Sequence, residues 1–355
     1  MTKIAILGYG VVGSGVAEVL HNSAAMIEAR RGIALSVKSI LDIRRFPGDP
    51  FEHCFVSSFD DIENDLSVRV VVETIGGTGA AYDFTKRALK SGKHVVTSNK
   101  ELVAEHGPEL LELAREKQVN YLFEAAVGGG TPLIYPLAQC LSANRISSVC
   151  GILNGTCNYI LTRMRDNGFT FDEALLEAQK SGYAEGDPSD DILGHDTARK
   201  ISILASLVIG RQIFPKHVQT MGINRVTPEH LREAADNGYA IKLIGRVTIC
   251  ESSPPVIYAE PHLLKRGHPL FAVDGVFNAV LITGDVVGDV LFYGKGAGKE
   301  PTASAVVSDI VACMRANDPL GGLAWYEIPV RLAQPDSIHS APHHTFTDGT
   351  TLRVM

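Results

Sequence analysis

The residues best suited to chemistry lie between positions 178 and 200, in the segment AQKSGYAEGDPSDDILGHDTARK. Asp196 and Lys200 are four residues apart, a spacing that places two side chains on one face of a helix. Carboxylates beside one ammonium group suit a small substrate that carries an amine and a hydroxyl or carbonyl. The plain alternative is an ordinary ion pair on a solvated helix face. Four further carboxylates precede this pair, at Glu185, Asp187, Asp190 and Asp191.

A glycine pattern near the N-terminus, KIAILGYGVVGSGVAEVL, has the spacing G-x-G-x-x-G. A short buried strand is predicted before the glycines and an apolar-periodic helix after them. This context is typical of a dinucleotide site, because the glycines permit a tight turn, close approach of a pyrophosphate and close helix–strand packing. The free N–H groups at the start of the helix would face the phosphates. The alternative is a glycine-rich turn that binds nothing. The predicted contacts are Gly8, Gly10, Val11, Val12 and Gly13.

Strands and helices alternate through the first third of the chain. Further strands are predicted at 35–43, 68–73, 94–97 and 120–124, with helices at 80–91 and 101–117. This alternation predicts an α/β fold with a Rossmann-type, doubly wound parallel sheet. Ligands of such sheets bind at the carboxyl ends of the strands. The residues predicted there are Thr74, Ile75, Ser98, Asn99, Lys100 and Glu124.

Asp42 ends the second predicted strand, where an acidic residue normally accepts a hydrogen bond from the ribose 2′-hydroxyl of NAD. Arg44 and Arg45 could instead meet the 2′-phosphate of NADP, so the sequence leaves both cofactors open. A third reading makes Asp42 a loop cap. The distance from Gly13 exceeds the usual spacing of about 20 residues, which indicates an extended first helix or loop.

The chain changes character near the glycine run at 128–130. Strands at 147–152, 278–287 and 289–293, a hairpin over 241–260, and helices at 172–181 and 191–209 predict a second α+β domain with a mixed sheet. We therefore predict a nucleotide-binding domain over 1–127, completed by about 295–325, a second domain over 128–294, and a C-terminal tail over 330–355.

Composition excludes several classes of function. A net charge of −7 and the lack of any basic run argue against nucleic-acid binding. No apolar run approaches the roughly 20 residues that span a bilayer. The six cysteines show no C-x-x-C spacing, which fits reduced thiols in a cytoplasm. The sequence enters a predicted strand at its N-terminus, where a signal peptide would otherwise stand, so we expect a cytoplasmic protein.

Residues 178–200 follow the pattern A-x3-G-aromatic-small-x2-D-P-x2-D-aliphatic-x-G-x-D-x3-K without mismatch, and by this pattern the chain resembles the homoserine dehydrogenases. Other segments typical of that family are SNK at 98–100, EAAVGGGTP at 124–132, NGT at 154–156 and GAGKEPTASAV at 296–306. The resemblance implies NAD(P)-dependent interconversion of L-homoserine and L-aspartate 4-semialdehyde, in threonine, methionine and isoleucine biosynthesis. It also implies a homodimer, with substrate binding, catalysis and dimerisation in the second domain.

The resemblance also assigns roles to residues. Lys200 is the expected proton-transfer group, oriented by Asp196, although the roles of Lys100 and Lys200 could be exchanged. Glu185 and Asp191 are the expected partners of the substrate ammonium, and a lysine can meet its carboxylate. The implied substrate contacts are Lys100, Gly155, Thr156, Tyr183, Glu185, Asp191, Asp196 and Lys200.

Two glycine-containing segments complete the expected site. Family positions that match Glu124, Val127, Gly129 and Thr131 hold a monovalent cation, expected to be sodium, largely through backbone carbonyls. A glycine hinge between the domains is the alternative and is compatible with it. Gly296 and Gly298 are expected near the nicotinamide, just before a helix that starts at 301–302. The alternative there is a simple helix-opening loop.

Two other functions fit the same fold. One is a dehydrogenase for another amino acid, such as a diaminopimelate-type deaminase, against which segments 178–200 and 98–100 count. The other is a redox-sensing or structural protein without turnover, against which Lys200 and Asp196 count. Many bacterial relatives continue into an ACT-type regulatory domain. The 26 residues after Pro329 are too few for one, so we expect a form that lacks it, with a polar tail on the surface. His339, His343 and His344 would alternatively suggest a metal.

Overall fold

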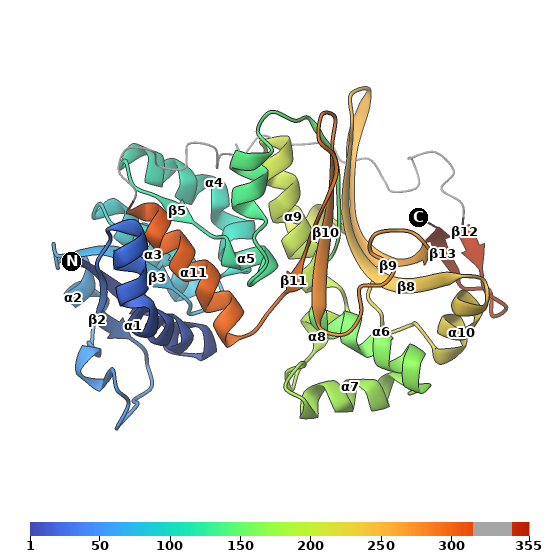
Figure 1. The fold of residues 1–355 in the computed structure, drawn as a ribbon, viewed down its shortest axis with the longest axis horizontal. Coiled ribbons are helices and arrows are strands. Elements are labelled where there is room, and N and C mark those ends of the chain that lie inside the picture. The colour runs from blue at the N-terminus through green and yellow to red at the C-terminus, as the bar shows by residue number, and fades with distance from the viewer. Residues whose placement is uncertain (315–342, 355) are drawn as a thin grey trace. The chain divides into compact units, whose positions relative to one another are not determined.

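The structure, a computed structural model, describes residues 1–314 and 343–354. It divides into two compact units (Figure 1), each with its own sheet. The first comprises Met1–Ala138 and the segment that begins at Ala297, and the second comprises Gln139–Gly296 and the last described residues. The division therefore lies after the predicted boundary at 127. No helix within the described ranges is long and apolar enough to cross a membrane.

The first unit contains a five-stranded parallel sheet with the order β2-β1-β3-β4-β5. This confirms the predicted doubly wound fold. The two central strands are continuous apolar runs because helices cover both of their faces, and Ile4–Ile6 and Val70–Val72 are completely buried. The strands are β1 (Thr2–Leu7), β2 (Leu35–Leu41), β3 (Val68–Glu73), β4 (His94–Thr97) and β5 (Tyr121–Leu122).

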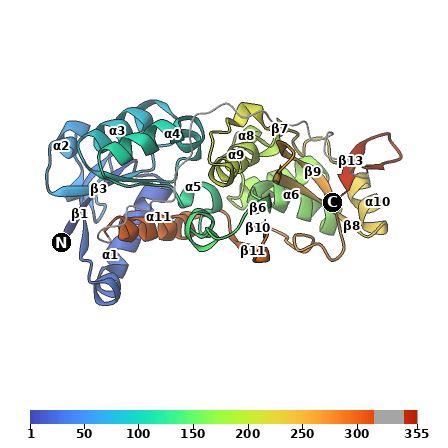
Figure 2. The same cartoon turned by 90° about the horizontal axis from the view of Figure 1, so that it is seen from above.

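A late segment of the chain completes the first unit. Helix α11 (Lys299–Cys313) packs along α1 (Val11–Arg31), as Figure 2 shows. A Cβ atom on Gly15 would lie 2.8 Å from the Lys299 Cγ atom, so the two helices approach closely at this glycine. The other helices of this unit are η1 (Glu52–Cys54), α2 (Phe59–Glu63), α3 (Gly79–Lys90), α4 (Lys100–Glu116) and α5 (Ala125–Gly128).

The second unit is built on a mixed eight-stranded sheet, as predicted. Its order is β11-β10-β6-β8-β9-β13-β12, and β7 also pairs with β9. Neighbours from β11 to β9 are antiparallel, whereas β13 and β7 pair with β9 in parallel. The strands are β6 (Ile146–Ile152), β7 (Gln219–Thr220), β8 (Tyr239–Cys250), β9 (Ser253–Lys265), β10 (Phe277–Gly284), β11 (Gly288–Lys295), β12 (His343–Thr345) and β13 (Thr351–Val354).

The prediction of one continuous helix over 191–209 is wrong. Gly194 has a φ of 84°, in the left-handed region, and separates the short helix α8 (Ser189–Ile192) from α9 (His195–Ile209). The break puts Asp196 in the first turn of α9. The remaining helices of this unit are α6 (Gly155–Asn167), α7 (Phe171–Lys180), η3 (Pro215–His217) and α10 (Pro228–Asp236), and a π-helical turn spans Pro136–Cys140.

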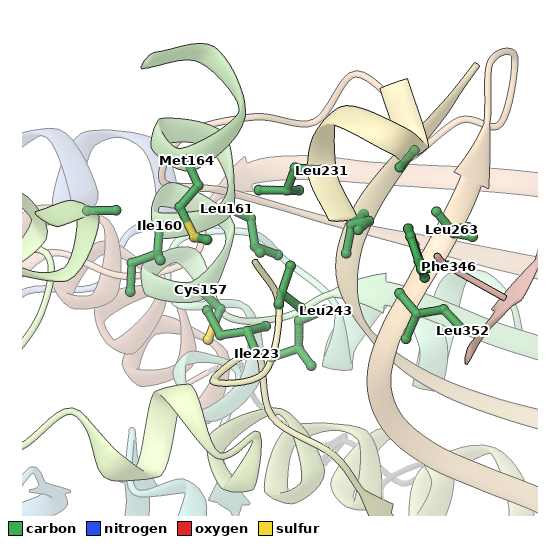
Figure 3. Close-up of a cluster of buried hydrophobic side chains, with 14 of the residues drawn as sticks. Cys157, Ile160, Leu161, Met164, Ile223, Leu231, Leu243, Leu263, Phe346 and Leu352 are labelled. Carbon is green, nitrogen blue, oxygen red and sulfur yellow. The ribbon is translucent and has the colours of Figure 1, made fainter. Parts of the chain in front are cut away.

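The prediction of a surface tail is wrong for residues 343–354, because they form a hairpin whose strand β13 extends the sheet at β9. Phe346 and Leu352 are 3% and 7% exposed and belong to the core cluster of Figure 3, with Leu231 and Leu263. Burial of these two apolar side chains explains why the segment docks. Residues 330–342, with His339, and residue 355 lie outside the described part of the chain. Among the described residues, no group of side chains could hold a metal ion.

Candidate active site

The glycine turn after β1 is as tight as the motif predicts. Gly8 has a φ of 86°, and a Cβ atom on Gly13 would lie 1.9 Å from the carbonyl oxygen of Gly8. The Thr74 hydroxyl donates to that same carbonyl over 2.8 Å. Gly10 differs, because the nearest atom to a Cβ there is Nη2 of Arg44, at 3.8 Å. Gly10 therefore faces open space at the start of α1, where the N–H groups of Val11, Val12 and Gly13 begin the helix.

Asp42 follows β2 and points toward this turn. Its carboxylate accepts from the backbone N–H of Tyr9 over 2.6 Å and from the N–H of Arg44 over 2.8 Å. The Arg44 guanidinium adds bonds of 3.0 and 2.9 Å to the two oxygens. Hydrogen bonding to Arg44 lowers the pKa of Asp42 to about 2. Asp42 is thus both a loop-capping residue and a carboxylate aimed at the turn, and Arg45 is exposed.

Glu73 links two loops at the carboxyl edge of the sheet, a role that sequence reasoning missed. Its completely buried carboxylate accepts from the backbone N–H of Ile75 over 2.7 Å and from the Thr97 hydroxyl over 2.6 Å. The amide of Asn99 donates to the carbonyl of Gly77 over 2.7 Å. Burial raises the pKa of Glu73. These bonds connect the segment 74–77 to the segment 98–100, where Lys100 begins α4.

The first unit gathers most of the predicted cofactor residues at one edge of its sheet. The glycine turn, Asp42 and the segments 74–77 and 98–100 all follow carboxyl ends of parallel strands, the usual place for a ligand in this fold. Gly298, at the start of α11, also belongs to this unit, whereas Gly296 belongs to the second. A Cβ on Gly296 would overlap the amide nitrogen of Asn278, at 1.9 Å, so any other residue there would have to displace the Asn278 side chain.

The segment from Glu124 to Thr131 forms one compact loop around α5. The Glu124 carboxylate accepts from the backbone N–H groups of Leu133, Ile134 and Tyr135, over 2.5 to 2.8 Å. The backbone N–H of Glu124 donates in turn to buried Asp309 of α11 over 2.9 Å. Burial raises the pKa of both carboxyl groups. The Glu124 side chain thus holds the loop in shape, which leaves carbonyl oxygens of the loop as the candidate cation ligands.

In the second unit, Asp196 and Lys200 meet on the buried face of α9. The Lys200 Nζ atom lies 2.9 Å from Oδ2 of Asp196 and donates over 2.9 Å to the carbonyl of Leu153, at the end of β6. Both residues are buried, with 2% and 9% of their surface exposed. The plain reading of a solvated ion pair is therefore excluded.

Asn154 lies against the same pair, and the prediction of site residues did not include it. Its amide nitrogen donates to Oδ1 of Asp191 over 2.7 Å and to Oδ2 of Asp196 over 2.8 Å. A sequence signal did exist, because Asn immediately before a helix is a preferred N-cap. Asn154 does cap α6, by accepting from the N–H of Cys157 over 2.7 Å.

Of the other expected substrate contacts, Lys100 belongs to the first unit and the rest belong to the second. The Thr156 hydroxyl donates to the carbonyl of Tyr183 over 2.6 Å, which ties the start of α6 to the loop before α8. Tyr183 and Glu185 are exposed, whereas Asp191 is half-buried. A Cβ on Gly155 would lie 2.7 Å from the carbonyl of Val276, so only glycine fits there. These residues of the second unit therefore offer carboxylates and the buried ammonium group of Lys200 to a small polar ligand.

Comparison with known proteins agrees with this geometry. A family model described as "Homoserine dehydrogenase, NAD binding domain" matches residues 8–124, and one described as "Homoserine dehydrogenase" matches residues 132–311. A homoserine dehydrogenase of Synechocystis is 44% identical over 315 residues, which cover 87% of this chain and 72% of that protein. A homoserine dehydrogenase of Pseudomonas aeruginosa is 41% identical, with 96% and 78% covered.

Solved structures give the same result. The crystal structure of a homoserine dehydrogenase from Thiobacillus denitrificans has a TM-score of 0.87 and 39% identity, with 95% of this chain and 80% of that chain covered. A hyperthermophilic archaeal homoserine dehydrogenase in complex with NADPH has a TM-score of 0.75 and 28% identity, with 90% and 99% covered. Family models, relatives and structures all lead to one conclusion: this chain belongs to the homoserine dehydrogenase family.

Proposed function

We propose that the Asp196–Lys200 pair moves the proton in the NAD(P)-dependent interconversion of L-homoserine and L-aspartate 4-semialdehyde. One observation carries this assignment, namely the buried contact of 2.9 Å between the Lys200 ammonium and Asp196. A lysine held by two acceptors has a fixed position, as a proton-transfer group requires. The glycine turn and the open space at Gly10 fit a dinucleotide in the first unit.

The glycine turn of Gly8, Gly10 and Gly13 and the segments 74–77 and 98–100 would hold the dinucleotide. A bound nicotinamide would supply the hydride acceptor for the carbinol carbon of homoserine, or the hydride donor for the aldehyde.

During oxidation Lys200 acts as the neutral amine, after its ammonium proton has passed to solvent. The amine takes the hydroxyl proton, the electrons of the broken oxygen–hydrogen bond form the carbonyl as the hydride leaves, and Asp196 stabilises the resulting ammonium. During reduction the Lys200 ammonium returns the proton to the forming alkoxide. Lys100, which begins α4 in the first unit, is the alternative proton carrier.

The acidic loop of the second unit is proposed to bind the substrate ammonium. We propose Glu185 and Asp191 as the partners. Glu185 lies in the loop before α8, which the Thr156 hydroxyl ties to α6, and Asp191 lies in α8 itself. Asp191 already accepts from the uncharged amide of Asn154, and this bond leaves its negative charge in place.

The direct test is an initial-rate assay that follows absorbance of the reduced nicotinamide. We expect turnover with L-homoserine and none with meso-diaminopimelate, under the same cofactor and protein concentrations. Turnover of diaminopimelate alone would support the deaminase alternative. Cofactor binding without turnover of either substrate would support a sensor.

Cofactor choice is proposed to depend on Arg44. In its bond with Asp42 the guanidinium lies beside Gly10, and a 2′-phosphate can compete for it as a bidentate ligand. We therefore expect use of both NAD and NADP. Arg44→Ala removes a charge-assisted bond of about 1.5–3 kcal/mol, which predicts a fall in kcat/KM for NADP of about 10- to 100-fold and little change for NAD. A larger effect of Arg45→Ala would assign the phosphate to Arg45 instead.

A monovalent cation, sodium, is proposed to bind the loop of Glu124, Val127, Gly129 and Thr131. Support comes from the fixed curvature of this loop, in which Gly129 has a φ of 55° and the N–H of Thr131 donates to the carbonyl of Gly128 over 2.8 Å. Thermal unfolding in sodium chloride and in tetramethylammonium chloride, at equal ionic strength, tests it. We expect a higher Tm in sodium, and equal values would contradict the proposal.

The chain is also proposed to act as a cytoplasmic homodimer. Edge strand β11 exposes Leu291 and Tyr293 on one face, with 42% and 53% of their surface accessible, and an exposed apolar strand face favours self-association. All six cysteines are free thiols, as expected in a reducing compartment. Sedimentation equilibrium should give twice the mass of the chain.

A further inference from the structure

Asn154 occupies the junction between β6 and α6, where its side chain makes bonds in two directions. It is 4% exposed. Its Oδ1 atom accepts from the N–H of Cys157 over 2.7 Å, and this bond fixes the orientation of the amide. The amide nitrogen must then face the two carboxylates, Asp191 at 2.7 Å and Asp196 at 2.8 Å.

The Asn154 amide bonds to the same Asp196 oxygen that contacts Lys200. Oδ2 of Asp196 accepts both from Asn154 and from the Nζ atom of Lys200. Leu153, the residue just before Asn154, gives its carbonyl to the same Nζ atom over 2.9 Å. Two successive residues therefore hold the pair: Asn154 holds the Asp196 carboxylate, and Leu153 holds the Lys200 ammonium.

The Asn154 amide also reduces repulsion between the carboxylates of Asp191 and Asp196. Asp191 and Asp196 both bond to one nitrogen atom, so their negative charges lie close together, and Asp196 is buried. Like charges at such a distance repel, and an uncharged donor between them offsets part of this repulsion. We expect loss of the donor to let Asp196 shift away from Asp191 and so to lengthen its contact with Lys200.

We propose that Asn154 is a positioning residue that clamps Asp191 and Asp196 and so fixes Lys200 for proton transfer. This inference rests on the proposed role of the Asp196–Lys200 pair. Asn154 moves no proton itself. Its effect through Asp196 should appear in kcat, and its effect through Asp191, the proposed partner of the substrate ammonium, should appear in the KM for homoserine. The KM for the cofactor should not change.

The main variant is Asn154→Ser, because serine keeps the N-cap of α6 and removes the clamp. We expect kcat to fall about 10- to 100-fold, as a displacement of about 1 Å does in other sites, while the KM for the cofactor stays within about twofold. Asn154→Asp is a second variant that keeps size and cap and replaces the donor with an acceptor. It should lower kcat at least as much.

Asn158 provides a matched control one turn further along α6. It is 1% exposed and donates to the carbonyls of Val273 and Phe277, each over 3.1 Å, away from Asp196. Asn158→Ser should lower the Tm and leave kcat per folded enzyme unchanged. Comparison of the two serine variants separates loss of stability from loss of the clamp.

A double-mutant cycle gives the decisive result. If Asn154 acts through Asp196, Asn154→Ser should change kcat less than about twofold in an Asp196→Ala background. An equal effect in both backgrounds, or a rise in the KM for homoserine with kcat unchanged, would overturn the inference. Lys200→Ala is measured alongside. If Lys200→Ala lowers kcat and Asn154→Ser does not, the clamp alone is wrong; if Lys200→Ala has no effect, the proposed function of the pair is wrong.

Discussion

Replacement of Gly10 by alanine should weaken cofactor binding without unfolding the protein. The φ of Gly10 is −82°, which alanine adopts easily, and the nearest atom to the new Cβ would be 3.8 Å away. Gly10 is the N-cap of α1, and replacement of an N-cap residue by alanine costs at most about 1 kcal/mol of folding free energy here. The new methyl group would, however, point toward the space where a pyrophosphate approaches the helix. Loss of one or two charge-assisted N–H bonds predicts an increase in cofactor Kd of about 10- to 100-fold.

Gly13→Ala makes the opposite prediction and serves as the comparison. Its Cβ would lie 1.9 Å from the carbonyl of Gly8 and 2.9 Å from the Thr74 hydroxyl, so backbone must move and the Tm must fall. Fluorescence titration with NADPH and thermal unfolding of both variants separate the two effects. A Gly10→Ala protein with wild-type cofactor affinity would refute the placement of the pyrophosphate at this turn.

Three further changes test other parts of the structure. Glu185→Gln keeps shape and removes one charge, so the KM for homoserine should rise with a smaller effect on kcat, and an unchanged KM would leave Asp191 as the ammonium partner. Glu73→Ala leaves the buried donors of Ile75 and Thr97 without an acceptor, which should cost about 2–5 kcal/mol in urea unfolding and raise the KM for the cofactor; an unchanged stability would show that these donors find other partners. Phe346→Ala should lower unfolding free energy by about 3–5 kcal/mol, and a loss below about 1 kcal/mol would mean that the hairpin is not part of the core.

Much of the first unit was predictable from sequence because its signals are local. Strands β3 and β4 have the predicted bounds, Val68–Glu73 and His94–Thr97. Each is an apolar run with turn-forming residues at its end, and the alternation with helices requires parallel pairing. The i,i+4 spacing of Asp196 and Lys200 likewise needs only helical geometry, and the pair does form.

The remaining features depend on contacts between distant residues. Asn154 bonds to carboxylates 37 and 42 positions away, and Glu73 bonds to a hydroxyl 24 positions away. No local pattern marks such pairs. The hairpin of residues 343–354 looks polar along the sequence. Phe346 and Leu352 are buried because the hairpin pairs with β9, and no local pattern predicts that pairing. The break at Gly194 was missed because one glycine within an apolar-periodic segment is compatible with a helix.

The central claim is that Lys200, held by Asp196, moves the proton. Single-turnover oxidation of L-homoserine by Lys200→Ala, followed by absorbance of the reduced cofactor, tests it most directly. Arg199→Ala is the matched control, because the neighbouring Arg199 pairs with Asp190, outside the buried pair. We predict that Lys200→Ala slows the chemical step by about 10²- to 10⁴-fold, with cofactor Kd unchanged and Arg199→Ala close to wild type. A rate within about tenfold of wild type would contradict the account and transfer the role to Lys100.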